Sequence, residues 1–181
     1  MASEENHHIL DLPTFSDPVK ILIVVSPYYK DIADNLVAGA TAALKSAGAT
    51  WDIVEMPGAL EIPTAIRIAD RHSNFDGFVA LGCVIRGETS HYETVCNDSS
   101  RALQLMGLDC LCIGNGILTV ENRTQAEVRA DPGAQNKGGG AASAALHLIA
   151  LARKWGRSTG AVGFRSESIL IAQNTKGPQI T

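Results

Sequence analysis

Lys20-Ile-Leu-Ile-Val-Val-Ser26 is a continuous apolar run in which β-branched residues predominate. A run of this kind, with no alternating polar residues, is typical of a strand that is covered on both faces. Residues 20–26 therefore predict a central strand of a parallel sheet.

Helix and strand patterns alternate along the chain after this run. Ile32, Leu36, Ala40 and Leu44 recur every four residues and predict a helix of about four turns that ends near Gly48. Further apolar runs predict strands at residues 50–56, 77–85 and 109–118. Amphipathic patterns predict further helices near residues 62–69, 91–105, 122–130 and 138–154, with Gly107 closing the second of these.

This alternation predicts one α/β domain, a three-layer sandwich in which helices flank a four-stranded, mainly parallel sheet. The length of 181 residues and the hydrophobic content of 45% suit a single core. The domain should span residues 19–156, after a polar leader at residues 1–18. We expect the polar residues 157–181 to form a disordered tail.

Charge and hydropathy exclude several classes of function. The chain has 15 Lys and Arg against 19 Asp and Glu, a net charge of −4, with no basic cluster, which argues against nucleic-acid binding. The longest apolar stretches, residues 21–25 and 141–152, are shorter than the roughly 20 residues that span a membrane. Residues 1–11 lack the features of a secretory signal, so we expect a cytoplasmic protein.

The sequence predicts neither a metal site nor an organic cofactor. Its four cysteines show no Cys-x-x-Cys spacing, and we interpret them as buried, reduced thiols: Cys83, Cys96, Cys110 and Cys112. His91-x-Glu93 followed by Cys110-x-Cys112 differs from a zinc deaminase pattern, because one intervening residue in a strand would direct the thiols to opposite faces. Gly114-x-Gly116 lacks the third glycine of a dinucleotide-binding loop.

Ligands of parallel α/β sheets bind beyond the carboxyl ends of the strands. The segments that follow the predicted strands there are residues 26–29, 57–61, 83–91 and 113–116, with cations further on at residues 129 and 137. Together they supply an aromatic ring, a carboxylate, a histidine and a pair of cations.

Four blocks of these segments resemble the 6,7-dimethyl-8-ribityllumazine synthase family, over about residues 20–155. The blocks are Pro57-Gly58-Ala59-x-Glu61-Ile62-Pro63, Val84-Ile85-Arg86-Gly87-x-Thr89-Ser90-His91-Tyr92, Thr119-x-Glu121-Asn122-x-x-Gln125-Ala126-x-x-Arg129 and Asn136-Lys137-Gly138. The resemblance implies a flavodoxin-like fold and a transferase of riboflavin biosynthesis. It would condense 5-amino-6-(D-ribitylamino)uracil with 3,4-dihydroxy-2-butanone 4-phosphate, without metal or organic cofactor.

The resemblance also implies roles for individual residues. The ring of the pyrimidine substrate would stack on Tyr28, and its uracil edge would bond to the backbone of Cys83, Val84 and Ile85. The ribityl hydroxyls of the substrate would bond to Glu61, with backbone contacts from Ala59 and Leu60 next to that residue. Glu88 and Thr89 would bind the phosphate through their backbone and the threonine hydroxyl, and Arg129 would bind it through its guanidinium. Lys137 would lie near the phosphate. His91 would transfer protons. Asn115 stands where many members have an aromatic residue beside the pyrimidine.

Some of these residues also have purely structural interpretations. Tyr28 could be a boundary tyrosine, Glu61 an acid at a helix start, and Arg129 a solvated cation. His91 could cap a helix or pack in the core, and Lys137 could be a surface residue.

The family builds its sites between neighbouring subunits of a pentamer, so the resemblance implies a homo-oligomer of one or more pentamers. Riboflavin synthase is a further candidate partner. Two alternatives to an enzyme stay open, a non-catalytic lumazine or flavin carrier of the same fold and a structural shell protein. A carrier has no use for a phosphate-binding arginine or a proton-transferring histidine.

Overall fold

The computed structural model describes residues 8–158 of the protein. Its four strands form one sheet: β1 (Lys20–Val25), β2 (Thr50–Glu55), β3 (Gly77–Ile85) and β4 (Ile113–Val120). The order in the sheet is β2-β1-β3-β4, and each adjacent pair is parallel. The predicted α/β class and the central position of β1 are confirmed.

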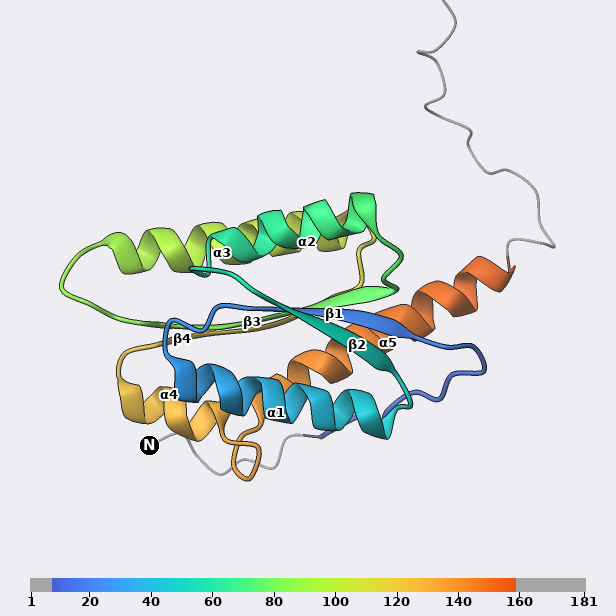
Figure 1. The fold of residues 1–181 in the computed structure, drawn as a ribbon, viewed down its shortest axis with the longest axis horizontal. Helices are drawn as coiled ribbons and strands as arrows, with labels where there is room; N and C mark the ends of the chain where they lie inside the picture. The colour runs from blue at the N-terminus through green and yellow to red at the C-terminus, as the bar shows by residue number, and fades with distance from the viewer. Residues whose placement is uncertain (1–7, 159–181) are drawn as a thin grey trace, which may run out of the picture.

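Five described helices cover the two faces of the sheet: α1 (Lys30–Ser46), α2 (Glu61–His72), α3 (His91–Leu108), α4 (Arg123–Ala130) and α5 (Lys137–Ser158). Figure 1 shows α2 and α3 on one face and α1, α4 and α5 on the other. The three layers predicted from the alternation are therefore present.

The unbroken apolar run of β1 follows from this layering. Ile21, Ile23 and Val25 pack into the core on the side of α1 and α5, while Leu22 and Val24 pack into the core on the side of α2. All five side chains are at most 4% exposed. Each of these five residues is thus buried, whichever face it points to.

Small residues bring α5 close to its neighbours. A Cβ atom at Gly138 would lie 2.0 Å from the carbonyl oxygen of Leu36, and one at Gly114 would lie 1.8 Å from that of Ala141. Both distances are far below van der Waals contact. Glycine is therefore required where α5 crosses α1 and β4, and this packing holds the start of α5 beside α1.

The boundary between α3 and β4 differs from the prediction. Gly107 lies inside α3, which continues to Leu108, and β4 begins at Ile113 rather than at residue 109. The residue that leaves the helix is Cys110, whose φ of 66° is left-handed, as is the φ of 71° at Gly48 after α1. The sequence pattern predicted that a glycine, Gly107, closes this helix, because residues that carry a side chain seldom adopt a left-handed φ.

This turn also corrects the interpretation of the cysteines. All four are free; Cys83 and Cys112 are buried as predicted, but Cys96 is half-buried and Cys110 is exposed. Cys110 precedes β4, so the argument that the Cys110 and Cys112 thiols alternate across a strand was wrong.

The two ends of the described region add detail. Leu12 and Phe15, within the predicted polar leader, pack against the core. Helix α5 runs to Ser158, past the predicted end at residue 154. Residues 159–181, most of the predicted tail, lie outside the described residues. Within residues 8–158, none of the helices combines the length and apolar character needed to span a bilayer.

Candidate functional site

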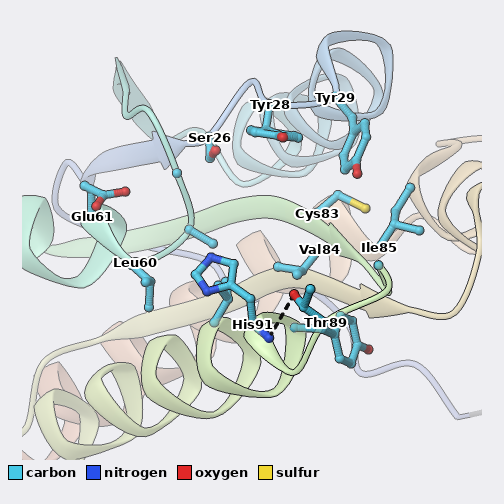
Figure 2. A pocket seen from close by; sticks show the side chains of 15 residues that line it. Ser26, Tyr28, Tyr29, Leu60, Glu61, Cys83, Val84, Ile85, Thr89 and His91 are labelled. Carbon is cyan, nitrogen blue, oxygen red and sulfur yellow. Dashed lines mark hydrogen bonds between the residues drawn. The ribbon is translucent and has the colours of Figure 1, made fainter.

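A cavity of about 450 Å³ opens where β1, β2 and β3 end. Its walls come from the connections that follow these three strands (Figure 2). Of the predicted site residues, it is lined by Tyr28, Ala59, Leu60, Glu61, Cys83, Val84, Ile85, Thr89 and His91. These residues come from three separate segments of the sequence, and the parallel sheet brings them to one edge.

The connection between β1 and α1 supplies an aromatic wall. The rings of Tyr28 and Tyr29 meet edge to face, with centroids 5.1 Å apart. Tyr28 is 72% exposed, so a face of its ring is free to meet a ligand. Burial raises the pKa of Tyr29 above its ordinary value, and its hydroxyl stays protonated near neutral pH.

The connection between β2 and α2 supplies the carboxylate. Glu61 is the first residue of α2, and its backbone N–H donates to the carbonyl of Gly58 at 3.3 Å. A Cβ atom at Gly58 would lie 2.8 Å from the Glu61 carboxylate. The carboxylate therefore folds back over Gly58 toward the cavity, and a larger residue at position 58 would displace it.

The end of β3 forms the floor. β1 pairs with β3 only as far as Val25 opposite Leu81, whereas β4 pairs with it up to Ile85. Along a strand between two parallel neighbours, the N–H and C=O groups of successive residues face one neighbour and then the other. Those of Cys83 and Ile85 face the β1 side, beyond the last residue of β1 that pairs, and have no described strand partner. These N–H and C=O groups border the cavity and are available to the edge of a planar, polar ligand.

The floor carries no activated thiol. Burial raises the pKa of Cys83 to about 11, so it is a neutral thiol near pH 7. A thiolate nucleophile is thereby excluded at this position.

The connection between β3 and α3 supplies the histidine. His91 begins α3, and its backbone N–H donates to the Thr89 hydroxyl at 3.4 Å. Figure 2 shows the imidazole rising from the start of α3 into the cavity, with the two tyrosines on the opposite wall. The His91 side chain is exposed and is not a core histidine.

Four predicted site residues do not line this cavity: Glu88, Asn115, Lys137 and Arg129. Arg129 is half-buried on α4 and donates from Nη1 to the carbonyl of Gln125 at 3.1 Å. The Asn115 side chain accepts from the N–H of Ile117 in its own strand at 3.0 Å, and Lys137 is exposed at the start of α5. One chain therefore brings together the aromatic, the carboxylate and the histidine, but leaves the predicted phosphate arginine apart from them.

The cavity also contains residues to which the sequence analysis assigned no role: Ser26, Tyr29, Gly58, Gly87, Tyr92 and Val95. Ser26 is 3% exposed, an unusual burial for a polar residue at a strand end. Each of the six lies within a few residues of a predicted strand end or site residue, and that position along the chain was the available signal.

Metal ligands do not cluster in the part of the chain that the structure describes. No group of three or more His, Cys, Asp or Glu side chains that could hold a metal ion occurs there.

Known proteins resemble this chain over most of its sequence. The family model for 6,7-dimethyl-8-ribityllumazine synthase matches residues 18–153. A 6,7-dimethyl-8-ribityllumazine synthase of Jannaschia sp. (strain CCS1) is 60% identical over 156 residues, covering 86% of this chain and 88% of the relative. That of Novosphingobium aromaticivorans is 54% identical over 136 residues, covering 75% of this chain and 98% of the relative. That of Bartonella henselae is 55% identical, covering 75% and 90%. The chain therefore belongs to the 6,7-dimethyl-8-ribityllumazine synthase family.

Proposed function

We propose that the protein condenses 5-amino-6-(D-ribitylamino)uracil with 3,4-dihydroxy-2-butanone 4-phosphate to form 6,7-dimethyl-8-ribityllumazine. The observation that carries this proposal is the convergence of an aromatic ring, a carboxylate, unpaired strand backbone and an imidazole in one cavity. Family membership over residues 18–153 supports the same reaction.

The pyrimidine substrate fits the cavity as follows. Its ring stacks on Tyr28, and its uracil edge bonds to the backbone of Cys83 and Ile85, which lacks a strand partner on that side, with Val84 between them. Glu61, with Ala59 and Leu60 beside it, accepts hydrogen bonds from the ribityl hydroxyls. Each contact matches a polar or planar part of the substrate to a group that the fold leaves free.

The reaction needs positioning and proton transfer rather than a protein nucleophile. The 5-amino group attacks the ketone, water leaves to give an imine, phosphate is eliminated, and the ribitylamino nitrogen closes the ring with loss of a second water. Holding both substrates together supplies much of the acceleration. His91 gives and takes protons in these steps, since an imidazole does both near neutral pH.

The phosphate is bound by Thr89 and the backbone of the β3–α3 connection, together with Arg129, and Lys137 lies close to it. Glu88 contributes its backbone only, and its carboxylate points away from the anion. Arg129, Lys137 and Asn115 lie outside the cavity of their own chain, which supports a site completed by a neighbouring copy. We assign Tyr28, Glu61 and His91 to one subunit and Arg129 to the next, in a pentamer or a multiple of pentamers.

Two further aspects of the proposal concern the cell. Riboflavin synthase, which would use the product, is a candidate partner. The four free cysteines support a reducing, cytoplasmic location.

The competing function is a carrier that binds the lumazine without making it. The experiment incubates the purified protein with both substrates and a chelator, and follows lumazine absorbance and released phosphate together. We expect equal amounts of both products in repeated turnovers. A protein that binds the lumazine tightly but releases neither product would be a carrier.

A further inference from the structure

Arg86, directly after β3, belongs to the sequence motif of the site but does not line the cavity. Its guanidinium is held from three directions. Nε donates to Glu121 at 2.7 Å, Nη1 donates to Glu93, and the guanidinium carbon lies 4.1 Å from the centre of the Tyr92 ring. Its backbone N–H also donates to the carbonyl of Val120 at 2.9 Å.

These contacts join the elements that carry the reacting groups. Glu93 and Tyr92 lie in the first turn of α3, which His91 begins, and Tyr92 lines the cavity. Glu121 precedes α4, the helix of Arg129, and its N–H donates to the Gln125 side chain at 3.0 Å. Arg86 therefore ties the start of α3 to the start of α4.

Among the described residues, few other side-chain contacts hold the connection between β3 and α3. Ser90 precedes α3 without a side-chain capping bond, and the His91 N–H bond to Thr89 is long, at 3.4 Å. A Cβ atom at Gly87 would meet nothing within 4 Å. The ion pairs of Arg86 thus form a main constraint on residues 87–90.

We propose that Arg86 is a positioning residue, which acts through Glu93, Glu121 and Tyr92 to hold the phosphate-binding connection and His91 in their reactive arrangement. The inference rests on the proposed function and names a residue that touches neither substrate. Arginine suits this role because its planar fork bonds two carboxylates while it stacks on a ring, which lysine cannot do.

A purely stabilising role does not account for this arrangement. The side chains of Arg86, Glu93 and Glu121 are 39%, 49% and 57% exposed. Ion pairs at such exposure contribute little to the free energy of unfolding, because water screens them. What these ion pairs can do is fix the position of the start of α3 relative to the start of α4, because Arg86 bonds to a carboxylate at each.

The test compares Arg86→Gln and Arg86→Lys with Arg101→Gln, a matched control. Arg101 is an arginine of α3 that likewise pairs with a carboxylate, that of Asp98, and does not line the cavity. We expect Arg86→Gln to lower kcat/KM by about 10- to 100-fold, the cost of a small misplacement of reacting groups. KM for the phosphate substrate should rise more than KM for the pyrimidine. Arg86→Lys should recover only part of the loss, and Arg101→Gln should match the wild type.

A double variant separates positioning from other roles. If Arg86 acts through Glu121, Arg86→Gln/Glu121→Gln should be no slower than Arg86→Gln alone. Product affinity and the midpoint of urea unfolding should stay at their wild-type values. Arg86→Gln as fast as Arg101→Gln would overturn the inference, as would a loss of product affinity and stability in parallel with activity. A wild-type protein that makes no lumazine would instead contradict the proposed function.

Discussion

Two regions at the same edge of the sheet differ in how completely one chain assembles them. The first, which we call the ring region, comprises Tyr28, Glu61 and His91, all of which line one cavity. The second, the anion region, comprises Arg129 and Lys137 on α4 and α5, and neither lines it. A single chain thus forms a binding surface for a planar ligand but leaves its cationic partner elsewhere. The difference supports the proposal that a neighbouring copy of the chain completes the site.

The strongest test of this comparison removes the anion region. Arg129→Ala should abolish turnover while lumazine binding is retained, because it deletes the charge-assisted partner of the phosphate and no contact to the ring. Steady-state kinetics and product titration on the same variant measure both. A kcat/KM for the phosphate substrate within about twofold of the wild type would contradict the role of Arg129.

Mixing variants tests whether the two regions come from different chains. Arg129→Ala and Glu61→Ala should each be nearly inactive alone. In co-assembled oligomers with equal, random mixing, about a quarter of the sites would combine one intact region from each neighbour. Recovery of about that share of activity is expected, whereas no recovery would place both regions in one chain.

A change within the ring region should slow the reaction without abolishing it. His91→Ala removes general acid–base help and should reduce kcat by about 10²- to 10⁴-fold. Amine attack on the ketone still proceeds between bound substrates, and lumazine affinity should change little. Unchanged turnover would remove His91 from the mechanism.

A smaller effect concerns the aromatic wall. Tyr28→Ala should weaken lumazine binding by about tenfold, the loss of one stacking contact. Tyr29→Phe keeps its ring and should leave the affinity nearly unchanged. Calorimetric titration of both variants checks this, and a larger loss for Tyr29→Phe would exchange the roles of the two tyrosines.

The smallest effect concerns the ion pairs that connect the two regions. The hydrogen bond from Arg86 holds the pKa of Glu93 below its ordinary value. A carboxylate whose pKa is lowered by folding contributes stability above its unfolded pKa and loses it as the pH falls through the folded value. Because Arg86→Gln removes the hydrogen bond that lowers this pKa, an NMR titration of the variant should find the Glu93 pKa returned toward its ordinary value. An unchanged pKa would show that the pair does not persist in solution.

Sequence reasoning succeeded where local pattern and burial agree. The all-apolar run of β1 predicted a strand buried on both faces, and the periodicity of residues 32–44 predicted α1. It failed at the end of α3, where Cys110 takes the left-handed conformation expected of a glycine. The hydrogen bonds from residues 109–111 back to α3 extend that end beyond Gly107. These contacts have no signature in hydrophobic spacing.

The sequence by itself determined the class of fold and the segments that carry the chemistry. Hydrophobic periodicity specifies which faces are buried, and in a parallel sheet the strand ends specify where ligands bind. Only the tertiary structure decided that Tyr28, Glu61 and His91 share one cavity, that β3 extends beyond β1 to leave its backbone open, and that Arg129 stands apart. The register of strands and the direction of a helix depend on packing between segments far apart in the chain, which no local pattern records.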